Sequence, residues 1–170
     1  MMLLPLTKHS RNIHEVTCQS GQEFLLISDL HWDNPHCDRG LLKNHLDEAV
    51  RRNAGIIMNG DTLCLMGGRY DKRADKSGVR PEHQVNNYLQ AVTEDAANWF
   101  KPYAKNILLI GYGNHETSIV KHTEFDPLLA VTSVLNYEAG TTVQLGGYGG
   151  TLDIRVNHDP LRSKNFVVHY

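Results

Sequence analysis

The sequence predicts an α/β fold, because three short apolar runs alternate with amphipathic helical segments along the chain. Each apolar run is too brief for a helix and is rich in aliphatic side chains, as buried strands are. The order strand, helix, strand, helix, strand implies right-handed crossovers and a parallel sheet that is covered on both faces. With 170 residues, of which 41% are hydrophobic, the chain is long enough for one ordinary domain, and we expect a single domain over residues 1–170.

The individual elements follow from the spacing of apolar residues. The predicted strands are apolar and end in polar residues, whereas the predicted helices repeat apolar residues at helical spacing with charged residues between them. In chain order we predict a strand at 23–28, a helix at 41–52, a strand at 55–60, a helix at 83–100, a strand at 106–111 and a helix at 127–135.

After the last of these helices the sequence pattern changes. Two alternating runs, at 141–145 and 151–156, flank the glycine-rich segment 146–150, and this arrangement predicts a β-hairpin. One more strand is expected to begin at residues 166–168, Phe-Val-Val.

Composition limits the classes of partner. Seventeen Lys and Arg against nineteen Asp and Glu give a formal net charge of -2, so the chain has no overall attraction to anionic membranes or duplex DNA. No apolar run approaches the ~20 residues that span a bilayer, and the three cysteines lack the spacing of a disulfide framework or zinc knuckle. We therefore expect a soluble, cytoplasmic protein with reduced thiols and no membrane partner. Ten histidines are the unusual feature, since imidazole is a common metal ligand.

Polar side chains follow each of the three predicted strands. Asp29 and His31 come after the first strand, Asp61 comes after the second, and residues 113–116, Gly-Asn-His-Glu, come after the third. Because parallel strands place their carboxyl ends along one edge, where ligands bind, we expect these side chains to lie close together. Each of them alone is equally typical of a cap or a turn, but three strand ends in register favour a metal site.

These motifs, taken in order, resemble those of the calcineurin-like metallophosphoesterases. The resemblance rests on Asp29-x-His31, Gly60-Asp61, the specific Gly-Asn-His-Glu at 113–116 and an isolated His169 at the end of an apolar strand, and it covers residues 23–170. It implies a four-layer α/β/β/α sandwich whose second sheet is incomplete at the C-terminus.

The resemblance also implies a role for each site residue. Asp29 and His31 would bind a first metal, Asp61 would bridge two metals, and Asn114 and His169 would bind the second; His115 would contact phosphate and protonate the leaving group, and Glu116 would orient His115. Two divalent metal ions, manganese, iron or zinc, are the implied cofactors. The implied activity is hydrolysis of a phosphomonoester or phosphodiester by a hydroxide that bridges the metals.

The sequence departs from the family pattern at its end. The pattern continues with a Gly-His-x-His motif, whereas this sequence stops at Tyr170, so two imidazole ligands are missing and we expect a truncated chain. A second hypothesis is therefore a catalytically impaired metal-binding or interaction module.

Several weaker features bear on the substrate and on accessory roles. A phosphate ester is the expected substrate, and a nucleic acid is an alternative, because Arg69, Lys72, Arg73, Lys76 and Arg80 form a basic loop after Asp61. A solvated loop is the competing interpretation. His36, Cys37 and Cys64 offer an accessory metal role, whereas Asp33 and Asp38 are interpreted as loop-turn residues. The oligomeric state is left open.

Overall fold

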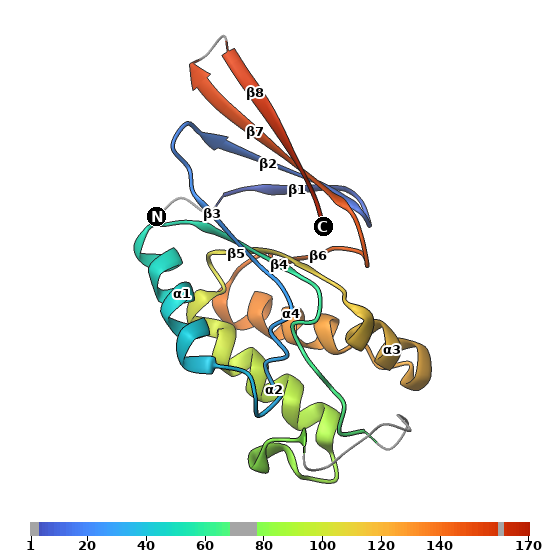
Figure 1. Ribbon diagram of the computed structural model, residues 1–170. Coiled ribbons are helices and arrows are strands. Elements are labelled where there is room, and N and C mark those ends of the chain that lie inside the picture. Colours follow the sequence, from blue (N-terminus) through green and yellow to red (C-terminus); the bar gives the residue numbers. More distant parts are fainter. Residues whose placement is uncertain (1–3, 69–77, 160–161) are drawn as a thin grey trace.

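A computed structural model of the chain describes residues 4–68, 78–159 and 162–170. Over these residues the fold is mixed α/β, with two four-stranded sheets and four α-helices (Figure 1). We name the sheet that touches the helices the inner sheet and the other the outer sheet. The inner sheet contains β3 (Phe24–Ile27), β4 (Gly55–Asn59), β5 (Ile107–Gly111) and β6 (Gln144–Leu145), in that order. The outer sheet contains β1 (Leu6–Ser10), β2 (Ile13–Gln19), β7 (Thr151–Asp159) and β8 (Arg162–His169), in that order.

The helices are α1 (Arg39–Arg51), α2 (Tyr88–Phe100), α3 (Asn114–Thr123) and α4 (Pro127–Ala139), with short 3-10 turns η2 (Pro81–His83) and η3 (Lys101–Tyr103). The helix predicted at 41–52 is confirmed as α1, and Asp38 caps it by accepting the Leu41 N–H at 2.9 Å. The helix predicted at 127–135 is confirmed as α4. The helix predicted at 83–100 begins later, at Tyr88, because His83 ends η2 and residues 84–87 form a turn.

The inner sheet is parallel throughout, as predicted. The strands expected at 23–28, 55–60 and 106–111 are confirmed as β3, β4 and β5, which pair side by side in the same direction. Their alternate residues enter two different cores. Ile56 and Met58 face the helices, whereas Ile57 faces the outer sheet and packs near Val16 and Leu152. The inner sheet is therefore the middle layer, with β4 and β5 buried at its centre and β3 partly exposed at its edge.

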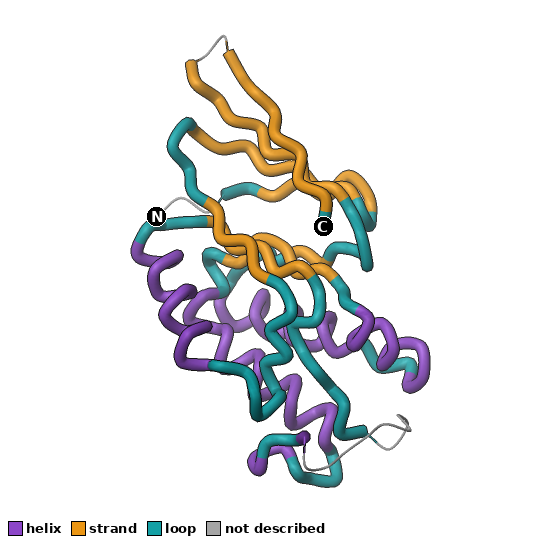
Figure 2. Tube along the Cα trace, in the orientation of Figure 1, coloured by secondary structure: helices purple, strands orange, loops and turns teal. Residues whose placement is uncertain are grey.

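The helices all lie on one side of the inner sheet (Figure 2). Each of the four contributes buried side chains to the same core, for example Leu46 from α1, Val92 from α2, Ile119 from α3 and Leu135 from α4. The other face of the inner sheet is covered by the outer sheet. Among the described residues no helix lies on the far face of the outer sheet, so three layers are present and the four-layer sandwich stays a prediction.

The predicted hairpin of residues 141–145 and 151–156 is wrong. β6 pairs in parallel with β5 in the inner sheet, whereas β7 pairs with β2 and β8 in the outer sheet. The intervening glycines carry the chain between the sheets, and the Tyr170 ring fills the space beside them: a Cβ at Gly146 or Gly150 would lie 2.6 Å or 2.5 Å from it. The hairpin of this region is instead β7 with β8, which begins at Arg162 rather than at Phe166.

Three elements were not predicted. β1 and β2 lie in a polar part of the chain. β2 buries every second residue, but one of the buried residues is the polar His14, so the apolar-polar alternation typical of a strand is weak in its sequence. Helix α3 begins at Asn114, directly after β5, and therefore places the Gly-Asn-His-Glu motif on a helix N-terminus rather than in a loop.

Candidate metal centre

The candidate site lies where β3 and β4 end. The chain that follows β3 runs along the chain that follows β4: the Asp29 N–H donates to the Gly60 carbonyl at 3.2 Å, and the His31 N–H donates to the Asp61 carbonyl at 2.9 Å. These bonds extend the pairing of the two strands beyond the sheet. They bring the first two predicted motifs side by side.

The backbone is strained at the predicted ligands. Asp29, His31 and Asp61 adopt left-handed conformations, with φ of 54°, 43° and 47°. They are three of the six residues other than glycine with positive φ in the described part of the chain. Such a conformation costs about 1–3 kcal/mol at each residue and persists only where the surroundings impose it, as they do at functional sites. The strain therefore marks this edge of the inner sheet as a candidate site.

The same three side chains converge. Ligand atoms of Asp29, His31 and Asp61 all lie within 4.8 Å of one another, and Asp61 is buried. The Nδ1 atom of His31 is buried without a hydrogen-bond partner among the described residues. A buried polar atom without a partner is costly, and two carboxylates beside it are hard to bring together unless a cation neutralises them. The donor set therefore fits one divalent cation.

Gly113 allows helix α3 to approach this cluster. A Cβ at position 113 would lie 2.0 Å from Asp61 Oδ1 and 2.3 Å from the Asp61 backbone nitrogen, so any larger residue would force Asp61 or the start of α3 to move. In the first turn of the helix, the His115 N–H donates to Asp61 Oδ1 at 3.1 Å. The third predicted motif is thereby joined to the second.

His115 lies at the border of the cluster. Its Nδ1 is 2.6 Å from the Cys64 carbonyl oxygen, and its ring meets the His31 ring edge to face at a centroid distance of 4.7 Å. Hydrogen bonding to Cys64, through the side chain first and then the carbonyl, raises the pKa of His115 to about 9 against the opposing effect of burial. His31, Cys64 and His115 form a second group of ligand atoms within 4.8 Å. Because Nδ1 is held by Cys64, Nε2 is the nitrogen of His115 that can meet a substrate.

Glu116 holds backbone rather than the His115 ring. It is fully buried, and its two oxygens accept the Leu63 N–H and the Gly113 N–H, each at 2.9 Å. Burial raises the pKa of this carboxyl group. The expectation that Glu116 orients the imidazole of His115 is therefore corrected, because the Cys64 carbonyl does so, and Glu116 instead ties the segment after β4 to the start of α3.

His169 is not among the described residues whose ligand atoms converge. Asn114 lies between Gly113 and His115, both of which approach Asp61, and it is exposed, as Asp29 is. His169 lies on the face of the outer sheet that points away from the inner sheet. Val168 and Tyr170 pack between the two sheets, so the alternation of side chains turns His169 to the opposite face, where its Nδ1 lies 3.4 Å from Thr151 Oγ1.

Sequence reasoning missed Asp33. The side chain is buried and accepts hydrogen bonds from the Cys64 N–H at 2.5 Å, the Leu65 N–H at 2.9 Å and the Tyr88 hydroxyl at 3.1 Å. Asp33 therefore fixes the position of Cys64, whose carbonyl oxygen contacts the His115 ring. Its position two residues after His31 is the only signal in the sequence, and that position is equally typical of the turn residue that we predicted.

The basic loop contributes little to the described site. Arg69, Lys72, Arg73 and Lys76 lie outside the described residues. Arg80 is described, and its guanidinium donates to the backbone carbonyls of Asn34 and Cys37, at 3.1 Å and 3.0 Å. This residue therefore holds the loop after His31 in place.

Comparison with protein-family models, curated proteins and solved structures finds no match to this chain. Within the described residues, no helix combines the length and apolar character needed to cross a membrane. The geometry of the site is thus the basis for any functional assignment.

Proposed function

We propose that the protein is a metal-dependent phosphoesterase that hydrolyses a phosphomonoester or phosphodiester at the carboxyl edge of the inner sheet. The observation that carries this proposal is the convergence of Asp29, His31 and Asp61, in strained conformations and with an unpartnered buried nitrogen on His31. Mixed carboxylate and imidazole donors favour manganese, iron or zinc. A bound cation would offset the charge of phosphate and acidify the attacking water.

The protein residues around the cluster are suited to a phosphate group. Helix α3 has ten residues, and its N-terminus begins next to Asp61, where the partial positive charge of the helix favours an anion. His115 is held by the Cys64 carbonyl with Nε2 left to contact a phosphate oxygen and to donate a proton to the leaving group. Asp33 and Glu116 keep these backbone segments in position.

The number of cations is proposed from the donors. Asp29, His31 and Asp61 form one group of three donors. A second cation, as the resemblance implies, would share Asp61 and use Asn114, and we leave His169 out of the proposed ligand set.

The order of the motifs is similar to that of calcineurin-like metallophosphoesterases, and we propose their four-layer sandwich as the architecture. The helices and the two sheets supply three of its layers.

The position of His169 favours one alternative function. With this side chain on the far face of the outer sheet, the second cation has fewer donors, so a catalytically impaired metal-binding module is the competing proposal.

Substitution of Asp61 tests the proposal most directly. Asp61→Asn keeps an oxygen that can accept the His115 N–H but removes the negative charge. We therefore expect the affinity for manganese, measured by titration calorimetry, to fall at least about 100-fold, the upper end of the loss caused by removing an outer-shell partner of a metal ligand. Hydrolysis of 4-nitrophenyl phosphate and bis(4-nitrophenyl) phosphate should fall to background. Asp47→Asn, at an exposed carboxylate on α1, is the matched control and should leave both measurements unchanged.

The results separate the two proposals. Wild-type affinity in Asp61→Asn would contradict the metal site itself. Manganese binding that depends on Asp61 but is accompanied by no turnover of either ester would favour the impaired module over the phosphoesterase.

A further inference from the structure

A cavity of about 760 Å³ opens beside the candidate metal centre. Asp29, His31 and His115 form its wall on the side of the metal centre, and the end of β3 and the first turns of α1 form the rest. The volume is in the range of clefts that hold small organic ligands. A molecule bound at the cluster can therefore extend into this cavity.

The remaining lining is mostly apolar. Ile27, Leu30, Leu41 and Leu42 supply aliphatic surface. Leu41 is 52% exposed although it is a large apolar side chain, so a ligand in the cavity would remove this surface from water. The apolar residues come from β3, the loop that follows it and α1, so three segments of the chain contribute to this lining.

Away from His115 at the metal centre, the polar residues of the lining are neutral amides, imidazoles and thiols, with one carboxylate. They include the amide of Asn34 and the imidazoles of His36 and His45, which can stack on or hydrogen-bond to a ring. None of the described residues that line the cavity is a lysine or arginine. Asp38 is a carboxylate, and it already caps α1 through the Leu41 N–H. A strand of nucleic acid needs cations along its phosphates, so this lining does not favour one.

We infer that the cavity holds a neutral, mainly apolar aromatic group, of the size of an aryl ring or a nucleobase, while the phosphate that carries it lies at Asp29, His31 and Asp61. This inference rests on the proposed function and specifies its substrate class: a small aromatic phosphate ester. The rigid parts of the cavity are already in place, since Leu42 is buried against the helical core and Asp38 fixes the start of α1.

The test compares two phosphonates that differ only in the group the cavity would hold. Binding of phenylphosphonate and methylphosphonate to the full chain with manganese is measured by titration calorimetry. We expect phenylphosphonate to bind at least about 10-fold more tightly, because the apolar lining contacts only the ring. Leu41→Asp, which places a charge in the lining, should abolish this difference while manganese affinity stays at the wild-type value.

Leu129→Asp provides the matched control, because Leu129 is 53% exposed on α4 and does not line the cavity. It should keep the wild-type preference for the phenyl compound. Equal affinity of the wild type for the two phosphonates would overturn the cavity assignment and leave the phosphate site standing. Binding of neither compound, although manganese binds, would overturn the proposed function as well. Tighter binding of a short oligothymidylate than of phenylphosphonate would overturn the substrate class in favour of nucleic acid.

Discussion

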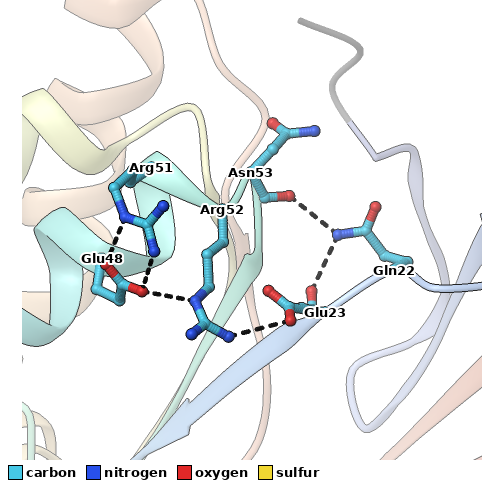
Figure 3. Close-up of polar contacts among 6 residues, drawn as sticks. All are labelled: Gln22, Glu23, Glu48, Arg51, Arg52 and Asn53. Carbon is cyan, nitrogen blue, oxygen red and sulfur yellow. Dashed lines mark hydrogen bonds and ion pairs between the residues drawn. The ribbon is translucent and has the colours of Figure 1, made fainter.

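At the amino end of the inner sheet carboxylates face arginines in water, whereas at the carboxyl end they face backbone N–H groups in the protein interior. The first arrangement joins the residues before β3 to the end of α1 (Figure 3). Glu48 accepts from the Nε atoms of Arg51 and Arg52, each at 2.6 Å, and Arg52 also reaches Glu23 at 3.1 Å. Gln22 donates to the Asn53 carbonyl at 3.0 Å in the same network.

Asp33 and Glu116, the buried carboxylates at the other end, have no arginine or lysine partner in the described structure. Asp33 accepts from two backbone N–H groups and the Tyr88 hydroxyl, and Glu116 accepts from two backbone N–H groups. Water can replace a lost partner at the amino end, but it cannot reach a buried N–H group at the carboxyl end. The carboxylates at the two ends accept a similar number of hydrogen bonds, so their burial decides at which end these bonds contribute more to the stability of the fold.

The largest expected effect is that of Asp33→Ala. The substitution leaves three buried donors without an acceptor, and each such group costs about 1–3 kcal/mol, so the free energy of unfolding should fall by roughly 3 kcal/mol or more. Urea unfolding followed by circular dichroism measures it. Asp38→Ala, in the same loop but exposed, is the control and should cost only about 1 kcal/mol as a lost helix cap. Similar losses in the two variants would break the contrast between buried and exposed carboxylates.

A second substitution tests the close packing at the carboxyl end. Gly113→Ala places a methyl group against Asp61, so we expect a loss of about 1–3 kcal/mol in unfolding free energy, typical of overpacking, and a clear loss of manganese affinity. Gly78→Ala is the control, because its Cβ would meet nothing within 4 Å and its φ is not in the left-handed region. If Gly113→Ala bound manganese like the wild type, the helix would not need to approach Asp61 so closely.

The smallest effect is expected at the amino end. Hydrogen bonds from Arg51 and Arg52 lower the pKa of Glu48 from its ordinary 4.5 to about 2. The ion pairs therefore contribute to stability above about pH 4.5, and this contribution is lost as the pH falls toward 2. Glu48→Gln should lower the midpoint of thermal unfolding only slightly at pH 7, and the difference from the wild type should shrink as the pH falls toward 2 and in 1 M salt, where exposed charges are screened. A large difference in unfolding midpoint between the variant and the wild type in 1 M salt would show that this network is strong although it is exposed.

Much of the fold could be predicted because it depends on local sequence. The apolar runs of β3, β4 and β5 and the helical spacing of α1 and α4 are visible in the residues themselves, and the position of Asp29, His31 and Asp61 just past two strand ends follows from them. Once the strands are parallel, their carboxyl ends must share an edge. The convergence of these three side chains was therefore predictable once β3 and β4 were taken as parallel neighbours.

The sequence by itself thus determined that β3, β4, β5, α1 and α4 form, and which polar residues follow the three strands. Only the tertiary structure decided that residues 144–145 join β5 instead of β7, that His169 lies on the far face of its sheet and that Asp33 is buried. Each of these depends on pairing between distant segments, such as β2 with β7, or on which face of a strand meets the core. A shift of one residue in such pairing reverses every side chain, and hydrophobic spacing alone does not specify the partner.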